Sequence, residues 1–183
     1  MKTTILYIFA LLILVLFGAF IYRWQNYNDN RQNHKPQLWA KHVDKILVLK
    51  SQRKMFLLNN DHVIKEYDID LGGNPFGHKR QSGDNKTPEG LYEISGRNPK
   101  SKFFLSLRIS YPNAEDIKKS RELGVSPGGD IMIHGLPNIT TLLGLNAFLP
   151  RDWTEGCLAV RSNKEMLEIW DNVALKTPIE IRH

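Results

Sequence analysis

The feature that most constrains this chain is a stretch of 20 residues, Thr3 to Tyr22, without a charged side chain. At about 1.5 Å per residue, a helix of this length spans about 30 Å, the thickness of a bilayer's hydrocarbon core. A cleavable signal has an apolar region of about 7–15 residues before a small-x-small site, and Gly18-Ala19-Phe20 is a poor site of that kind. We therefore expect residues 1–23 to be an uncleaved anchor that crosses the membrane through residues 3–22, rather than a cleaved signal or a buried core helix.

Asn- and Gln-rich sequence follows the apolar stretch. The run from Gln25 to Pro36 has no hydrophobic periodicity, so we expect residues 24–39 to form a tether. Beyond it there is no internal repeat, and residues 40–183 are expected to form one domain with its own core. The single cysteine, Cys157, excludes an intramolecular disulfide and a cysteine-rich metal site.

The charge balance is mildly basic. The whole chain has 25 basic and 19 acidic residues, and the chain without residues 1–23 keeps 23 basic residues against the same 19 acidic ones. So small an excess is typical of a solvated surface, and we expect no nucleic-acid partner. Four cations, Arg23, Arg31, Lys35 and Lys41, follow the span, whereas only Lys2 precedes it, so the positive-inside count favours a cytosolic domain. We treat that count as ambiguous.

The first half of the domain has strand patterns. Short apolar runs at residues 46–49 and 55–58 flank a turn at Ser51–Arg53, and a run with alternating apolar residues follows at residues 62–71. After a polar loop, further strands are predicted at residues 90–94 and 103–109, and a last one at 178–181.

Helical patterns are fewer. Residues 114–123 predict a short surface helix that ends at Gly124, and Ser162–Glu165 has the form of a capping box that opens a second helix. In that second helix, apolar residues at three- and four-residue steps should dock on the sheet: Met166, Ile169, Trp170 and Val173. The expected fold class is a β-rich α+β domain, an antiparallel or mixed sheet with a few peripheral helices, preceded by one transmembrane helix.

Two segments place a reactive side chain at the edge of an apolar run. His134 follows Ile131-Met132-Ile133 and precedes Gly135, and Cys157 follows Gly156 and begins a second apolar run. A cysteine attacks as the thiolate, so a nucleophilic Cys157 needs an imidazole partner, for which His134 is the best-placed candidate. From spacing alone, a small buried cysteine and a structural histidine at a strand end remain the simpler interpretation.

The remaining histidines give no metal-binding pattern. They are scattered along the chain, and none forms an HxH or HExxH spacing: His34, His42, His62, His78 and His183. We therefore expect no metal site.

Together, the motifs resemble those of the L,D-transpeptidase catalytic-domain family (YkuD-like), over about residues 45–181. The family has an HG pair, here His134-Gly135, followed by a Ser/Thr-x-Gly-Cys element, here Thr154-Glu155-Gly156-Cys157. The stretch from Lys86 to Ile94 (KTPEGLYEI) is similar to a further family motif, and the opening hairpins match its first strands. Four ordered motifs are more specific than any one alone.

The resemblance implies a mixed β-sheet fold and a thiol enzyme. Cys157 would attack the L,D amide between meso-diaminopimelate and the terminal D-residue of a peptidoglycan stem peptide, giving a thioester. His134 would act as general base, the carbonyl of Gly135 would orient it, and amides near Gly156 and Cys157 would hold the oxyanion. Transfer of the acyl group to an amine is transpeptidation, and transfer to water is hydrolysis. No cofactor is implied.

The sequence departs from the common family pattern at two positions. Glu155 and Ala159 stand where many members have a histidine and an arginine or asparagine. Glu155 would raise the pKa of a neighbouring thiol. Arg151 and Arg161 are candidate replacements for the missing cation, or solvated surface residues. This variant resembles the branch that includes enzymes which detach lipoproteins from peptidoglycan, which adds a lipoprotein as a candidate partner.

Supporting residues follow from the same resemblance. We expect the substrate-binding residues to be Thr154, Trp153, Arg151, Arg108 and Tyr111, with Trp153 as a wall of the cleft and loop packing as the alternative for Arg108 and Tyr111. Thr87 and Pro88 should shape a turn. The interval between His134 and Cys157 is long, and its Leu-rich insert, residues 136–145, is expected to be a lid, a short helix over the site or additional core.

These observations favour a peptidoglycan L,D-transpeptidase. The alternatives are a carboxypeptidase or endopeptidase that hydrolyses the same linkage, lipoprotein release included, and a tethered wall-binding module without activity. A peptidoglycan substrate places the domain in the periplasm, on a single-pass anchor in the inner membrane. An oxidising compartment is compatible with a catalytic thiol here, because the chain has no second cysteine to trap it.

Overall fold

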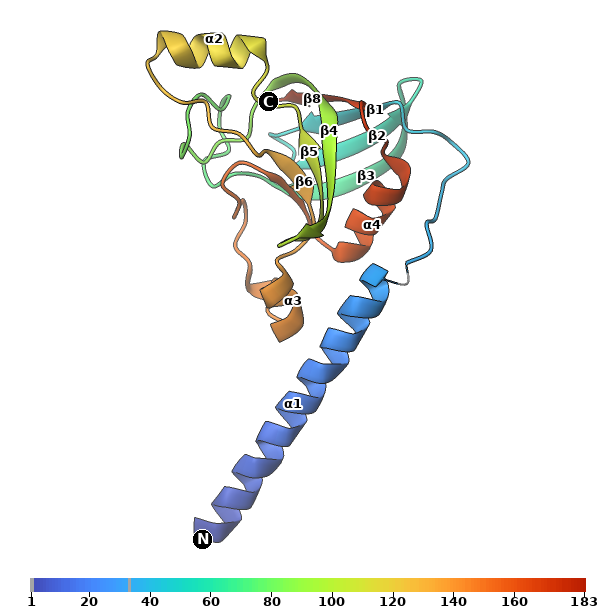
Figure 1. Ribbon diagram of the computed structural model, residues 1–183, viewed down its shortest axis with the longest axis vertical. Helices are drawn as coiled ribbons and strands as arrows, with labels where there is room; N and C mark the ends of the chain where they lie inside the picture. The colour runs from blue at the N-terminus through green and yellow to red at the C-terminus, as the bar shows by residue number, and fades with distance from the viewer. Residues whose placement is uncertain (1, 33) are drawn as a thin grey trace.

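Eight strands form the body of the molecule, which we describe from a computed structural model (Figure 1). The structure describes the backbone of residues 2–32 and 34–183; Met1, in the expected anchor, and Asn33, in the expected tether, lie outside the described residues. The strands are β1 Lys45–Leu49, β2 Lys54–Asn59, β3 His62–Asp70, β4 Gly90–Ser101, β5 Phe104–Ile109, β6 Met132–His134, β7 Leu158–Val160 and β8 Pro178–Arg182. The helices are α1 Lys2–Gln32, α2 Ala114–Glu122, α3 Asn138–Leu143, the short 3₁₀ helix η1 Asn146–Phe148, and α4 Asn163–Asn172.

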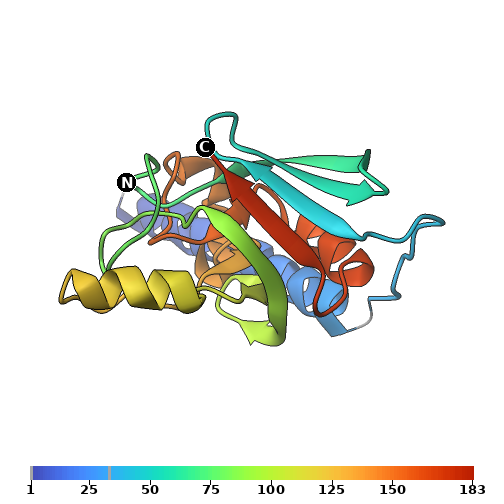
Figure 2. The same cartoon turned by 90° about the horizontal axis from the view of Figure 1, so that it is seen from above.

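The strands close into a barrel with the order β1-β2-β3-β7-β6-β5-β4-β8. Two neighbouring pairs, β1–β8 and β6–β7, are parallel, and the other pairs are antiparallel. The expected β-rich fold with a mixed sheet is confirmed. Its closure depends on β8, which lies between β1 and β4 although it ends the chain. In the view from above, α2 lies on the opposite side of the molecule from the β1–β3 hairpins (Figure 2).

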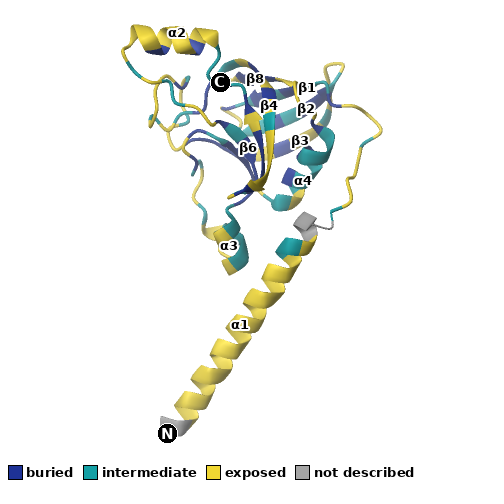
Figure 3. Cartoon of the chain, viewed as in Figure 1, coloured by how far each residue is buried: buried dark blue, intermediate teal, exposed yellow. Residues whose placement is uncertain are grey.

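The core lies inside the barrel and under α4, as the burial pattern shows (Figure 3). Alternate residues of the strands point inward, so β1 buries Ile46 and Val48 while the residues between them stay half-exposed. In α4, the Ser162 hydroxyl accepts a hydrogen bond from the Glu165 amide, 3.2 Å away, and caps the helix. The apolar face of α4 is buried against the sheet as expected, through Met166, Ile169 and Val173, with Trp170 packed against the edge of the core.

The anchor helix is longer than we expected. Its segment Thr4–Asp29 is long and apolar enough, by length and composition, to cross a membrane. The first part of the expected tether is helical, because α1 continues to Gln32. The extension contacts the domain: the ring of Tyr27 packs edge-on against Phe104, with centroids 5.8 Å apart. A tertiary contact of this kind stabilises helix in sequence that has no helical periodicity.

The rest of the expected tether is held against α4. His34 Nε2 lies 2.7 Å from the Asp171 carboxylate, which also accepts a hydrogen bond from the Gln37 amide at 2.8 Å. The Trp39 amide donates to the Asn172 side chain at 2.8 Å. Residues 34–39 therefore form an irregular but fixed connection between α1 and the barrel.

The Leu-rich insert forms α3 and the turn that follows it. Leu136 at the start of the insert is buried, but α3 buries none of its residues, so the insert adds little core. The short helix is present, and it lies beside the end of α1 nearest the domain (Figure 1).

Candidate active site

The parallel pairing of β6 and β7 brings the two reactive segments together. Ile133 pairs with Leu158 and His134 with Ala159. Cys157 immediately precedes β7, so it lies beside Met132, which is two residues from His134 and on the same face of β6. The register therefore directs the thiol and the imidazole to the same side of the sheet.

Both side chains line one cavity of about 410 Å³. Its wall is formed by the β6–β7 edge, the turn before β7 and the tip of the β4–β5 hairpin: Phe103, Asp130, Met132, His134, Trp153, Thr154, Glu155 and Cys157. Two of the expected substrate-binding residues, Trp153 and Thr154, thus line the cavity, together with Glu155. Neither α3 nor η1 lines it, so the Leu-rich insert does not cover the thiol.

His134 is almost completely buried, with 1% of its surface exposed. Its Nδ1 lies 2.7 Å from the carbonyl oxygen of Gly135. Burial lowers the pKa of His134 to about 4, although the hydrogen bond to Gly135 acts in the opposite direction. The imidazole is therefore neutral at neutral pH, and because a carbonyl only accepts, the proton is on Nδ1. This tautomer leaves the lone pair of Nε2 available to accept a proton.

Two aromatic rings enclose the imidazole. Phe103 stacks on His134 with centroids 4.3 Å apart, and Trp153 meets it edge-on at 5.5 Å. The Gly135 amide donates to the Phe103 carbonyl at 3.1 Å, which fixes the hairpin tip against the end of β6. Our sequence interpretation missed Phe103, since an apolar residue at a strand end carries no signal that distinguishes a ring over a histidine from a core residue.

The thiol of Cys157 is held in its protonated form. The pKa of Cys157 is raised to about 11, chiefly by burial, with the nearby carboxylates of Asp130 and Glu155 acting in the same direction, while the Met132 amide donates to the sulfur and lowers it. Sγ in turn lies 3.5 Å from the carbonyl oxygen of Asp130. The expected effect of Glu155 on the thiol is confirmed in direction, and the Met132 amide is a contact that no sequence pattern indicates.

The turn before Cys157 is fixed by Thr154. Its hydroxyl donates to the carbonyl of Cys157 at 2.8 Å and accepts from the amide of Gly156 at 3.1 Å. Thr154 thus lines the cavity while its hydroxyl is occupied within the turn, and the Gly156 amide is directed at that hydroxyl.

Gly156 itself has a structural requirement. Its φ of +133° is rare for residues with a side chain, and a Cβ would lie 2.6 Å from the carbonyl oxygen of Lys86. That neighbouring loop is held in place by Thr87, whose buried hydroxyl accepts from the Gly72 amide at 3.1 Å. The KTPEG stretch thus supports the turn that carries Cys157, and Thr87 shapes backbone as expected.

The remaining candidates lie outside the cavity. Arg151 and Arg161 line a neighbouring cavity of about 360 Å³ on the other side of Trp153, around Asp70. Arg161 lies 3.0 Å from Asp70, and Arg151 is 3.9 Å away. Neither arginine therefore replaces the cation that many family members have near the thiol.

Arg108 and Tyr111 do not line the cavity either. Arg108 makes an exposed ion pair of 2.8 Å with Asp130, at the rim. Tyr111 is only 5% exposed, and its hydroxyl donates to the Pro127 carbonyl at 3.0 Å. For Tyr111 the contacts match the alternative of loop packing, because its one polar group is used inside the fold. Among the described residues, no group of three or more His, Cys, Asp or Glu side chains is placed to hold a metal ion.

Comparison with known proteins identifies the family of the domain. Residues 43–181 match the model of the L,D-transpeptidase catalytic domain, YkuD. No curated protein sequence matches the chain.

Two solved structures are similar over most of the chain. The helical cell shape determining protein Pgp2 from Campylobacter jejuni is 22% identical with a TM-score of 0.58, and the match covers 87% of this chain and 55% of Pgp2. Bd1075 from Bdellovibrio bacteriovorus is 32% identical with a TM-score of 0.52, and the match covers 78% of this chain and 49% of Bd1075. The chain thus spans about half the length of each, and the likeness to Pgp2 demonstrates a shared fold. With a family match over 139 of its 183 residues, the chain belongs to the L,D-transpeptidase catalytic-domain family.

Proposed function

We propose that this protein is a peptidoglycan L,D-transpeptidase in which Cys157 is the nucleophile and His134 the general base. The observation that supports this most strongly is that both side chains line one cavity, with a neutral imidazole whose Nδ1 is held by the Gly135 carbonyl. The peptidoglycan substrate is taken from membership of the family. The donor is a stem peptide, cleaved at the L,D amide of meso-diaminopimelate.

The reaction begins from an uncharged pair. Nε2 of His134 takes the proton of Sγ as the sulfur attacks the carbonyl carbon, so the thiolate forms only during attack. The C–N bond of the amide then breaks, and the leaving D-residue receives that proton on its amine from Nε2. A thioester on Cys157 remains. The acceptor amine next attacks the thioester, gives its proton to Nε2, and the C–S bond breaks with return of the proton to sulfur.

The oxyanion needs a backbone donor other than Gly156. Because the Gly156 amide is bonded to the Thr154 hydroxyl, the amide of Cys157 is the donor that this proposal assigns. The same Thr154 hydroxyl holds the Cys157 carbonyl, which fixes the orientation of the peptide units on both sides of the turn.

The charge at the rim of the cavity supports an amine as acceptor. Two carboxylates, Asp130 and Glu155, lie beside the thiol. Arg108 neutralises Asp130 through its ion pair, whereas no salt bridge involves Glu155 among the described residues. An unneutralised carboxylate attracts the ammonium form of an acceptor, which loses one proton to solvent before the neutral amine attacks, and it gives no advantage to water. This favours transpeptidation over hydrolysis.

The proposed location is the periplasmic face of the inner membrane, with α1 as an uncleaved anchor. The apolar segment of α1 and the extracytoplasmic position of peptidoglycan support this placement. The continuation of α1 to contacts with the barrel also supports a retained helix, since Tyr27 packs on Phe104.

The experiment supplies full-length protein in vesicles with tetrapeptide muropeptides and a labelled D-amino acid. We expect incorporation of the label, and its loss in Cys157→Ala and His134→Gln. Release of the terminal residue without incorporation would identify a hydrolase instead. If wild-type and Cys157→Ala protein give the same muropeptides and both sediment with peptidoglycan, the protein is a wall-binding module.

A matched variant tests the acceptor argument. Glu155→Gln removes the charge at the rim and keeps the shape, and we expect it to raise KM for the amine acceptor with little change in KM for the donor. Glu115→Gln, an exposed change on α2, is the control.

A further inference from the structure

The Leu-rich insert and the turn that follows it, residues 136–150, expose apolar side chains that the proposed chemistry does not use. From Leu136 to Pro150 the chain has 15 residues and no charge, although 24% of the whole chain is charged. Four of its large apolar side chains are exposed, and Phe148 is exposed to 80%: Ile139, Leu143, Leu145 and Phe148. Exposed apolar side chains gathered in one short segment of a soluble domain indicate a contact with a partner or a membrane.

The position of this surface indicates which partner covers it. Nη1 of Arg23 in α1 donates to the Leu143 carbonyl at 2.9 Å, and α3 packs beside α1. The large apolar side chains of α1 are between 51% and 76% exposed over residues 5–17, whereas Phe20 and Ile21, near the domain, are 36% and 38% exposed and Tyr22 remains 66% exposed.

The length of the span fixes the depth of this contact. The 20 uncharged residues Thr3 to Tyr22 span about 30 Å as a helix, so Arg23 lies at the level of the lipid headgroups. The Leu143 carbonyl, bonded to Arg23, lies at the same level. The apolar side chains of α3 and η1 are thus beside the bilayer surface and not at the far end of the domain.

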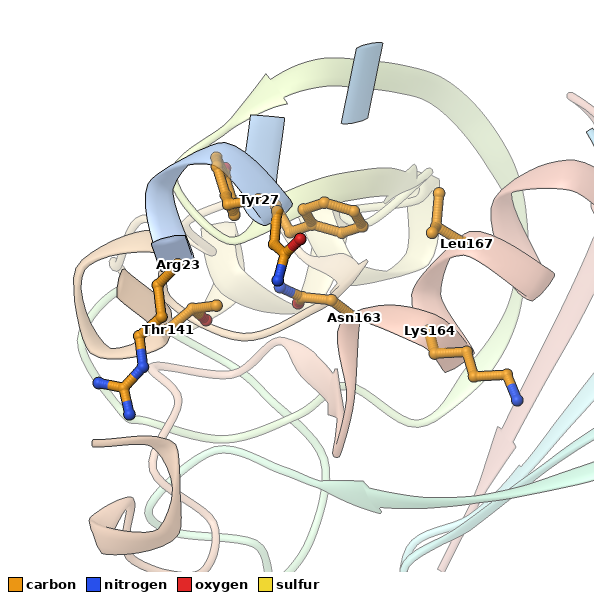
Figure 4. A pocket seen from close by; sticks show the side chains of 8 residues that line it. Arg23, Tyr27, Thr141, Asn163, Lys164 and Leu167 are labelled. Carbon is orange, nitrogen blue, oxygen red and sulfur yellow. The ribbon is translucent and has the colours of Figure 1, made fainter. Parts of the chain in front are cut away.

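The charges around the contact match a bilayer surface. A cavity of about 460 Å³ lies where α1, α3 and α4 meet, with Tyr27, Thr141 and Leu167 on its walls (Figure 4). No acidic residue is among the described residues that line it. In Figure 4, the cationic groups of Arg23 and Lys164 extend away from Tyr27, and both residues are exposed. Cations at this depth are attracted to anionic headgroups.

We propose that α3 and η1 form a second membrane contact, in which Ile139, Leu143, Leu145 and Phe148 enter the interfacial region of the bilayer that α1 spans. The inference rests on α1 being a retained anchor. Binding at two points fixes how the barrel is turned relative to the membrane. It also brings the cavity around Arg151 and Arg161 to the bilayer surface, because Asn146 and Ala147 of η1 line that cavity.

The experiment measures the depth of a probe on η1 in the full-length protein. Phe148→Cys in a Cys157→Ser background is labelled with a polarity-sensitive fluorophore and reconstituted in vesicles of phosphatidylethanolamine and phosphatidylglycerol. We expect blue-shifted emission that is quenched by spin-labelled lipids, more strongly when the spin label is near the headgroup than when it is near the chain end. The matched control is Leu123→Cys, an exposed apolar residue at the end of α2, which should emit as in water.

Each other outcome overturns the proposal. Emission as in water, with quenching by iodide, would place Phe148 in solvent. Blue-shifted emission without quenching by lipid would identify a protein partner, such as a second copy of the chain. The same vesicles are washed with alkaline carbonate: protein that washes off would refute the anchor itself, whereas retained protein with an unembedded probe would refute only the second contact. Leu145→Cys repeats the measurement at an independent position.

Discussion

The ring of Phe103 stacks on the imidazole of His134, with 4.3 Å between centroids and 25° between planes. Because the ring covers one face of the imidazole, it contributes to the burial that lowers the pKa of His134 to about 4. A base with so low a pKa stays unprotonated throughout the neutral range. The hairpin tip therefore controls whether the proposed base is in its active form.

Replacement of Phe103 by alanine should expose the imidazole. We expect the pKa of His134 to rise toward its ordinary value near 6.5, so the acidic limb of the pH profile of kcat/KM moves to higher pH by at least about one unit. The pH profile and NMR titration of the imidazole both measure this. Phe76→Ala, at an exposed loop phenylalanine, is the control. A stability loss without movement of the limb would mean that Phe103 only packs.

The reactivity of the thiol should report its raised pKa. Cys157 is the only cysteine, so iodoacetamide reports on it alone. With a pKa of about 11, alkylation should be slow at neutral pH and should accelerate about tenfold per pH unit up to that value, because only the thiolate reacts.

His134→Gln is the discriminating variant for this prediction. For a neutral pair, it should abolish acyl transfer but leave the alkylation profile of the resting thiol nearly unchanged. A rate that has already levelled off at neutral pH, and that falls in His134→Gln, would instead indicate a stable thiolate–imidazolium pair.

Local patterns in the sequence predicted the elements that depend on neighbouring residues. The helix over Ala114–Glu122 is specified by its own cap, where Asn113 and Asp116 form reciprocal hydrogen bonds, and by Gly124 with a φ of +68° after its end. Closure of the barrel could not be predicted in this way. It depends on parallel pairs between distant segments, and β6 and β7 have three residues each, too few to show a period.

In the candidate site, too, some residues could be predicted from the sequence and others could not. Cys157 and His134 could be predicted because their residue types are those of a nucleophile and a base. Met132 acts through its backbone amide and Phe103 through the face of its ring, and no sequence pattern indicates either contact. Tyr111 has a suitable residue type, but its hydroxyl is bonded to the Pro127 carbonyl inside the fold. Whether a polar group is available to substrate depends on contacts that only the folded chain defines.

A variant of Thr154 can distinguish a role in holding the turn before Cys157 from a role in binding substrate. Thr154→Val keeps the shape but leaves the Gly156 amide and the Cys157 carbonyl without their partner, which should cost about 1–3 kcal/mol in the free energy of unfolding. We expect kcat to fall about tenfold or more with little change in KM, because the nucleophile turn loses its orientation. Thr154→Ser, which retains the hydroxyl, should restore both. Urea denaturation and steady-state kinetics measure the two effects, and a rise in KM alone would return Thr154 to the substrate-binding residues.

Gly156→Ala tests the close approach between the nucleophile turn and the KTPEG loop. The added methyl would lie 2.6 Å from the Lys86 carbonyl oxygen, a backbone atom that cannot move independently, at a φ of +133° that disfavours any side chain. We expect a loss of about 2–4 kcal/mol in the free energy of unfolding, since overpacking and backbone strain add. Gly129→Ala is the matched control, because a Cβ there meets nothing within 4 Å and its stability should change by less than about 0.5 kcal/mol. Equal stability of the two variants would mean that the turn can move away from Lys86, and the thiol would then lack the fixed position that the proposed attack requires.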